Sequence, residues 1–383
     1  MGIYIFVLTL VFGGFLFFYR RPSYKGYNTI LFIVVLIICF GYMPGSDWRA
    51  YELIYDSYSE KDNFYWRFLF MEPMYLCLNI IGNELHLNFW AFFIILKVVM
   101  FCKIALIIKR FCPKELYLLA FTFYLGFWGI MNFMDPSLRN MIAAFIFMCS
   151  IDAVINRKFW HFFLWILLAA SFHYSSIVLI LFYFILNRKF SNRSIAICFV
   201  IVNIVFLNAN VTFAIAEKIF SSVPVIVTKI NSYTTGEESD LGQGKMLSFA
   251  YIMHVAFFIL ILHYRRELEK IQNGKFLFNI SVLFIFIFRI GLTSLIFSRF
   301  QLFIGCFYSV TIASVIYSFF KQYRLLYVVG IYCLSLIANY GQMKDVLFVP
   351  YTNYLLYYNS DLSYDYRSEY NFRNSPYKSN KRK

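Results

Sequence analysis

The sequence predicts an all-α protein that passes many times through a membrane. Hydrophobic residues make up 61% of the 383 residues and charged residues only 14%, too few to give a folded protein a water-facing surface of ordinary polarity. The hydrophobic residues also cluster into runs, most of them near the roughly 20 residues that a helix needs to cross a bilayer core. We therefore expect roughly ten to twelve transmembrane helices in a single domain over residues 1–355, and a polar, disordered tail over residues 356–383.

The predicted helices follow one another with mostly short connections. The first is followed by Arg20 and Arg21 and has no small-residue cleavage site, so we interpret it as a retained helix and not as a signal peptide. The segment 72–82 is short, and its sequence fits either a full span or a re-entrant helix. In order, the hydrophobic segments cover approximately residues 3–18, 27–42, 72–82, 87–108, 115–131, 138–155, 159–186, 194–212, 246–264, 276–297, 299–320 and 324–341.

The segment 159–186 is too long for one ordinary span. A polar notch over residues 171–176, with His173 inside it, predicts two short helices that meet as a hairpin. With this hairpin, the basic loops all fall on one side, which the positive-inside rule makes cytoplasmic, and the amino terminus is outside. These loops lie at residues 20–25, 109–114, 157–158, 188–193, 265–275 and 321–324. They account for the formal charge of +15, so we predict no nucleic-acid partner.

Two longer connections are predicted on the outer, periplasmic face, at residues 43–71 and 213–245. The first alternates charged residues with Tyr and Trp, a pattern typical of an amphipathic helix on a membrane surface. We expect this helix to cover the outer face.

Several kinds of chemistry lack the motifs that they require. The eight Cys show no C-x-x-C spacing, and the His residues lie in separate segments without ligand spacing, so we predict no metal site and no cofactor. The metalloprotease, phosphate-loop, hydrolase and dinucleotide motifs are also missing from the sequence.

Ionisable residues gather at the predicted outer ends of the helices. An ionisable group at the edge of an apolar segment is costly unless it meets a partner, a water-filled cavity or a ligand, so each is a functional candidate. Three Arg with one His and two carboxylates favour an anionic substrate, because guanidinium groups bind phosphate through forked hydrogen bonds. The candidates are Asp47, Arg49, Glu72, Arg139, His173 and Arg299.

Each candidate also has a purely structural interpretation. Arg139 and Arg299 could extend to the membrane interface, and His173 could be a hydrogen-bonded structural residue. Asp47 could pair with Arg49, and Glu72 could simply begin a helix before Pro73. Arg289, midway along the segment 276–297, could line a cavity or neutralise a partner.

The ordered set of motifs resembles the EpsG family of Wzy-like polysaccharide polymerases. Each motif is short, but together they cover most of residues 1–355. The chain departs from the family pattern at Asn140, where Gln is frequent, and at Tyr174, where a small or basic residue is common. The matching motifs are Gly45-Ser46-Asp47-Trp48 with Tyr51, Glu72-Pro73-Met74-Tyr75, Leu138-Arg139-Asn140 with Ala143 and Ala144, Ala169 to Ser175, Ser298-Arg299-Phe300, and Pro350-Tyr351.

The resemblance implies an architecture similar to the GT-C class of membrane glycosyltransferases. It implies a polymerase that transfers glycan from undecaprenyl pyrophosphate onto another lipid-linked repeat unit, at the outer face of the bacterial cytoplasmic membrane, by an inverting and metal-independent reaction. Its partners would be the lipid-linked oligosaccharide, membrane lipids, and a chain-length regulator and flippase of the same pathway.

On this hypothesis the basic residues hold the leaving group and a second group accepts a proton. We assign Arg139 and Arg299 to the pyrophosphate and His173 to proton transfer or acceptor orientation, with Asp47 as the competing base. Asp47, Arg49 and Glu72 are assigned to sugar binding or to support of the Arg side chains, and Tyr51 and Arg289 to substrate binding. Two other classes remain open: a flippase or transporter of lipid-linked oligosaccharide, and a membrane O-acyltransferase.

Overall fold

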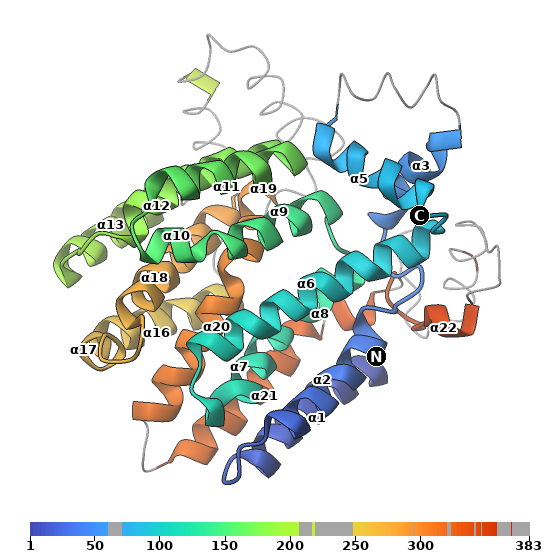
Figure 1. Cartoon of the computed structure of the whole chain (residues 1–383). Helices are drawn as coiled ribbons and strands as arrows, with labels where there is room; N and C mark the ends of the chain where they lie inside the picture. The colour runs from blue at the N-terminus through green and yellow to red at the C-terminus, as the bar shows by residue number, and fades with distance from the viewer. Residues whose placement is uncertain are drawn as a thin grey trace, which may run out of the picture. The chain divides into compact units, whose positions relative to one another are not determined.

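Figure 1 shows a computed structural model of the chain. Apart from one isolated bridge between Gly41 and Asn353, all regular secondary structure among the described residues is helical, so the all-α prediction is confirmed for them. Most of the predicted loop 213–245, part of the loop 43–71 and most of the tail 356–383 lie outside the described residues. The structure describes residues 1–59, 71–206, 217–218, 248–293, 295–319, 323–340, 342–345, 347–357 and 369.

The chain divides into two compact units, each described here by itself. Unit 1 comprises residues 1–183 and 312–383, and unit 2 comprises residues 184–311. The expectation of a single domain stays a prediction.

Unit 1 contains most of the helices. They are α1 (Gly2–Phe18), α2 (Tyr24–Ile38), α3 (Trp48–Asp56), α5 (Pro73–Glu84), α6 (Phe89–Phe111), α7 (Tyr117–Tyr124), α8 (Ile130–Met134), α9 (Leu138–Cys149), α10 (Ile151–Ile155), α11 (Phe159–Phe172), α21 (Arg324–Asn339) and α22 (Tyr354–Tyr357). A π-helical turn over Leu125–Gly129 joins α7 to α8.

Unit 2 contains α13 (Asn192–Val205), α16 (Phe249–His263), α17 (Arg265–Leu268), α18 (Gly274–Gly291) and α19 (Leu295–Ser298). Two further helices, α12 (Ile180–Leu186) and α20 (Gln301–Phe319), continue from one unit into the other. Several helices begin at a polar residue whose side chain accepts a backbone N–H of the first turn, as Ser23 does for α2, Asn88 for α6 and Ser191 for α13.

Among the residues that the structure describes, three helical segments are long and apolar enough to cross a membrane: Phe89–Phe111, Lys114–Met134 and Gly274–Gly291. Other apolar helices are shorter, at 10–17 residues, and include α1, α2, α9 and α11. The structure is therefore consistent with a membrane protein, whereas the expected number of ten to twelve spans and the GT-C-like arrangement stay predictions.

The predicted break in the segment 159–186 is present. Helix α11 ends at Phe172, His173 is extended, and a 3-10 helix over Tyr174–Leu179 leads into α12. The ring of Phe159, at the start of α11, lies 5.2 Å from the ring of Tyr183 in α12. Phe159 opens α11 and Tyr183 lies in α12, beyond the break, so the contact requires the chain to turn back at His173. The hairpin prediction is confirmed.

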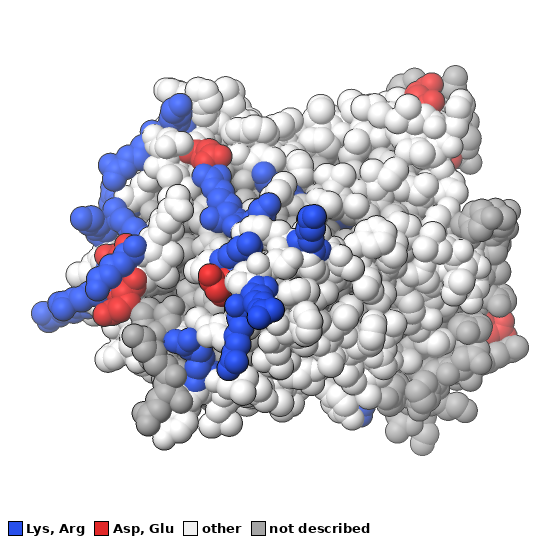
Figure 2. Space-filling view, turned by 60° about the horizontal axis from the view of Figure 1, so that its bottom comes forward, with Lys and Arg blue, Asp and Glu red and all other residues white. Residues whose placement is uncertain are grey.

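Basic loops of unit 1 converge at one end of that unit. The ammonium groups of Lys109 and Lys114 both lie over the ring of Tyr24, the first residue of α2. Arg110, at the end of α6, pairs with Asp152 in α10. Figure 2 shows Lys and Arg side chains gathered on the surface in view, with few Asp and Glu among them. This grouping is the pattern that the positive-inside rule requires, and the side of the membrane stays a prediction.

At the opposite end of α6 in unit 1, the chain after α21 folds against the end of α2. The backbone N–H of Tyr42 donates to the carbonyl of Thr352 at 2.9 Å, and the N–H of Tyr354 donates to the carbonyl of Phe40 at 2.8 Å. The N–H of Gly45 donates to the carbonyl of Leu347 at 3.0 Å. Pro350 and Tyr351 thus lie between two of these backbone hydrogen bonds, beside the loop at Gly45. About 300 residues separate that loop from Pro350 in sequence.

Candidate active site

Glu72 is the centre of a cluster of ionisable side chains in unit 1. Its Oε2 lies 2.5 Å from Nη1 of Arg139, and its Oε1 lies 3.4 Å from Nδ1 of His173. The side chain of Glu72 is only 6% exposed, whereas that of Arg139 is 32% exposed. One buried carboxylate therefore holds two basic side chains, and the arginine remains accessible.

Local sequence places each member of this Glu72 cluster at the end of a helix. Glu72 is extended because it precedes Pro73, which occupies the first turn of α5. Arg139 lies in the first turn of α9, where no acidic residue is present, and Glu72 supplies the negative charge that a helix amino terminus favours. His173 follows α11 and is held at the break by the adjacent turn.

The charge state of Glu72 follows from this packing. Burial by itself raises the pKa of Glu72, but the contact with His173 and the positive charge of Arg139 outweigh burial and lower the pKa to about 2. Glu72 is therefore a carboxylate at any physiological pH. A carboxylate beside Nδ1 of His173 favours the tautomer with a proton on Nδ1, which leaves Nε2 to accept a proton.

Aromatic residues of α3 and α5 line the buried side of the cluster. Tyr51 hydrogen-bonds Arg139, and its ring lies edge-on to the ring of Tyr75, 6.0 Å away. Tyr75 and Asn79 are fully buried on one face of α5. Among the described residues, the buried Arg139 Nε has no hydrogen-bond partner. Unsatisfied buried polar atoms are rare in folded proteins and mark a place where a polar ligand or water gains hydrogen bonds.

The Gly45-Ser46-Asp47-Trp48 motif is organised by a carboxylate that the sequence analysis did not select. Asp135, between α8 and α9, accepts the backbone N–H of Ser46 at 3.1 Å and that of Asp47 at 2.9 Å. Gly45 has φ of +76°, and a Cβ there would meet the Asp135 side chain at 2.1 Å. The glycine is thus required both for its backbone conformation and for the close approach of Asp135.

The predicted amphipathic helix is present as α3. Trp48, Tyr51 and Tyr55 are its buried residues, and they recur at the spacing of one helical face. The Trp48 ring packs 5.1 Å from that of Trp90 in α6. Asp47 and Arg49 are exposed at the start of α3. Whether α3 lies on a membrane surface stays a prediction, and residues 60–70 of this loop lie outside the described residues.

Two of the predicted site residues belong to unit 2. Arg289 in α18 is 1% exposed, its Nη2 donates to the carbonyl of Phe206 at 2.9 Å, and its guanidinium lies over the Tyr251 ring. Arg299 is exposed in the turn between α19 and α20. The structure thus brings together Tyr51, Glu72, Arg139 and His173, and it describes Arg289 and Arg299 within the other unit.

Two more ionisable residues near this end of unit 1 were missed by sequence analysis. Lys97 is fully buried in α6, 3.5 Å from the Gly41 carbonyl, and a Lys midway along an apolar segment was the available signal. Glu52 accepts a hydrogen bond from the Trp90 indole, and burial together with the charge of Asp56 raises the pKa of Glu52 to about 7. Glu52 lies among other charged and aromatic residues of α3, so nothing in the local sequence distinguished it as a site residue.

The geometry is a buried carboxylate that orients a histidine and holds an accessible arginine, at the opposite end of α9 from the basic loops. The profile of the EpsG family matches residues 24–353, a range that contains all of these side chains. The chain belongs to the EpsG family.

EpsG-family proteins are Wzy-like polysaccharide polymerases and glycosyltransferases. This EpsG-family protein has no match among curated proteins or solved structures. Within the described residues, no group of three or more His, Cys, Asp or Glu is placed to hold a metal ion. The prediction of family from the ordered motifs is confirmed, and the roles of the individual residues are proposals.

Proposed function

We propose that this EpsG-family protein is a polysaccharide polymerase that transfers glycan from a lipid pyrophosphate onto a second lipid-linked repeat unit. The observation that carries the proposal is the contact of Glu72 with both Arg139 and His173. This arrangement supplies the two things that the reaction needs, a positive charge for the leaving group and a base for the acceptor.

The proposed reaction is a single displacement at the anomeric carbon of the donor sugar. A hydroxyl oxygen of the acceptor forms the new bond to that carbon, and the bond from the carbon to the pyrophosphate oxygen breaks. The hydroxyl proton passes to Nε2 of His173, and the electron pair leaves with the lipid pyrophosphate. Attack opposite to the leaving group inverts the configuration at that carbon.

Arg139 is the proposed partner of the leaving group. Negative charge grows on the pyrophosphate as the glycosidic bond breaks, and a fixed guanidinium in a water-poor site stabilises that charge more strongly than water does. The contact with Glu72 fixes the Arg139 side chain before substrate arrives, and Tyr51 hydrogen-bonds the same guanidinium. Asp47 and Arg49 are proposed as further substrate contacts, and the roles expected for Arg289 and Arg299 stay predictions.

The outer face of the bacterial cytoplasmic membrane is the proposed location of the reaction. The support is that the Glu72 cluster and the basic loops of unit 1 lie at opposite ends of α9. Arg139 opens α9, and Asp152, just beyond its end, pairs with Arg110. If the basic end is cytoplasmic, the cluster faces outward.

The test uses purified protein in proteoliposomes supplied with lipid-linked repeat units. Arg139→Ala is expected to lower chain extension by about 100-fold or more, the usual loss when one stabilising contact to a developing negative charge is removed. Arg110→Ala is the matched control, because it removes an arginine from an ion pair with a carboxylate at the opposite end of unit 1. Full polymer from Arg139→Ala would contradict the proposal. Unchanged glycan that appears in the other leaflet would indicate a flippase instead.

A further inference from the structure

Unit 2 contains an apolar cavity of about 210 Å³ beside the chain that connects α12 to α13. Phe190 in that connection, Ile195 and Cys198 of α13, and Val282, Leu283 and Phe286 of α18 line it. The α18 residues share one helical face, so the cavity follows the seam between α13 and α18. The ring of Phe286 also stacks against the ring of Phe199 in α13, 6.0 Å away.

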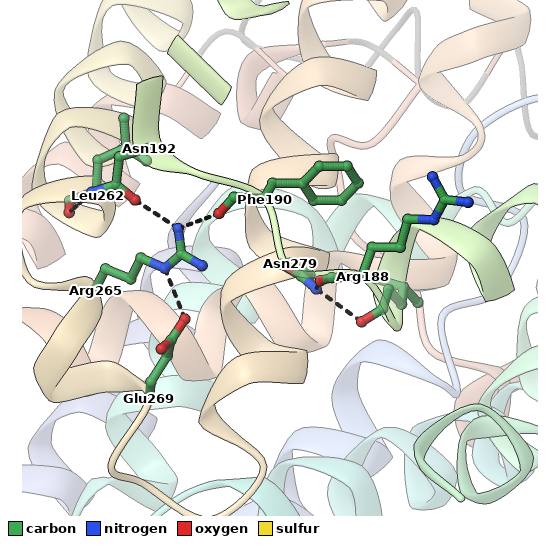
Figure 3. Close-up of polar contacts among 8 residues, drawn as sticks. Arg188, Phe190, Asn192, Leu262, Arg265, Glu269 and Asn279 are labelled. Carbon is green, nitrogen blue, oxygen red and sulfur yellow. Dashed lines mark hydrogen bonds and ion pairs between the residues drawn. The ribbon is translucent and has the colours of Figure 1, made fainter. Parts of the chain in front are cut away.

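The polar side chains that line the cavity, Asn279 and Ser194, already have hydrogen-bond partners. Asn279 lines the wall, and its amide donates to the carbonyls of Leu186 at 2.8 Å and Arg188 at 2.9 Å (Figure 3). An apolar cavity of comparable size remains dry and takes up apolar molecules. The lining of this cavity therefore favours a hydrocarbon occupant.

Three basic residues are adjacent in sequence to residues that line the cavity and are not engaged in this way. Arg188 and Lys189 directly precede Phe190, and Arg193 directly precedes Ser194, which also lines the cavity. All three are exposed, and within the described part of the chain their side chains form no ion pair. Figure 3 shows the Arg188 guanidinium pointing away from Asn279 and Arg265.

Arg265 shows the contrasting, structural use of an arginine at the same end of unit 2. Its Nε lies 2.7 Å from Oε1 of Glu269, and its Nη1 donates to the Phe190 carbonyl at 2.6 Å and to Oδ1 of Asn192 at 2.7 Å (Figure 3). These bonds hold the connection over residues 188–193 in place. They fix the positions of the three basic residues without neutralising them.

We propose that the cavity binds an anionic membrane phospholipid, with hydrocarbon chain in the cavity and the phosphate against Arg188, Lys189 and Arg193. The apolar lining matches the acyl chain and the uncompensated positive charge matches the phosphate. The predicted cytoplasmic side of these loops is also the side on which anionic lipid attracts basic residues. The proposal does not depend on the polymerase function.

The first test is lipid retention by the intact protein. Protein purified from mixed phosphatidylglycerol and phosphatidylcholine bilayers is analysed by native mass spectrometry. The wild type is expected to retain phosphatidylglycerol preferentially, and the triple variant R188Q/K189Q/R193Q to lower that retention by about ten-fold. The triple variant R20Q/R21Q/K25Q, at the basic end of unit 1, is the matched control and is expected to retain wild-type levels. The proposal would be overturned by equal retention of the two lipids, by equal loss in the two triple variants, or by retention of a polyprenyl lipid in place of both phospholipids.

The second test needs no substitution, because Cys198 lines the cavity and is exposed. An apolar maleimide is added to the wild-type protein in detergent with phosphatidylglycerol or with phosphatidylcholine, and labelled peptides are quantified by mass spectrometry. Phosphatidylglycerol is expected to slow labelling of Cys198 and to leave the exposed Cys102 and Cys333 unchanged. Labelling of Cys198 at the same rate with both lipids would refute the site.

Discussion

The Oε2 of Glu72 lies 2.5 Å from Nη1 of Arg139, across 67 positions of sequence. The same carboxylate faces His173 through its other oxygen. Glu72 is buried and ionised, and its negative charge is what attracts Arg139 and His173. Loss of that charge should therefore release both side chains.

Glu72→Gln is expected to impair both activity and stability. The amide has nearly the same shape but no charge, so Arg139 loses its compensating anion and His173 loses the group that sets its tautomer. We expect chain extension to fall at least about ten-fold and the free energy of unfolding to fall by roughly 1–3 kcal/mol, the usual range for a buried polar group left unpaired. Polymer length and thermal unfolding in detergent measure the two effects.

Glu269→Gln is the control for this substitution. Glu269 pairs with Arg265 one turn away, at a more exposed position, and such pairs contribute about 0.3–0.5 kcal/mol. If the two Gln variants behaved alike, the Glu72 pair would have no special role.

His173→Ala is expected to lower kcat for chain extension by about 100-fold or more while KM for the lipid-linked donor changes little, as for the loss of a general base. His161→Ala is the matched control, since His161 is exposed on helix α11, which His173 directly follows. Steady-state kinetics separates the two parameters. A variant with raised KM and unchanged kcat would make His173 a binding residue and would reassign the base.

Asp135 is expected to make stability depend on pH. Burial and the charge of Asp47 raise the pKa of Asp135 to about 6, from an ordinary value of 3.8. Between those values the folded protein binds more protons than the unfolded chain, so this contribution to stability is full below the ordinary value and is lost as pH rises to about 6. The unfolding temperature of the wild type should therefore fall more steeply from about pH 4 to about pH 6 than that of Asp135→Asn.

The wild type and Asp135→Asn are compared by the slope of unfolding temperature against pH and not by absolute stability. The reason is that Asn also weakens the contacts to the backbone of Ser46 and Asp47. The other carboxyls with raised pKa values, Glu52 and Asp56, are present in both proteins and cancel in the difference. Parallel slopes would show that Asp135 does not titrate in this range.

Gly45→Ala is expected to disrupt the turn before α3. Alanine is strained at φ of +76°, and its Cβ would meet Asp135 at 2.1 Å. The backbone conformation alone costs about 1–2 kcal/mol. Gly13→Ala is the control, because a Cβ on Gly13 meets nothing within 4 Å in the middle of α1. Thermal unfolding should show a clear loss for the first variant and none for the second, and equal stability would contradict the close approach of Asp135.

The sequence by itself determined the properties that depend on neighbouring residues. Runs of apolar residues predicted the helices, and the polar notch around His173 predicted the hairpin between α11 and α12, because helix formation and helix interruption are set locally. The motifs around Asp47, Glu72, Arg139 and His173, in their order along the chain, were sufficient to predict the family.

Only the tertiary structure decided which of these side chains meet. Glu72 was predicted as a supporting residue, but its contacts with Arg139 and His173 depend on how α5, α9 and α11 pack, which no local pattern encodes. Asp135 was missed because its role is to bind the backbone of a loop almost 90 positions away, and backbone amides leave no signature in a sequence. Helix positions follow from local hydrophobicity, whereas a site follows from the packing that brings distant residues into contact.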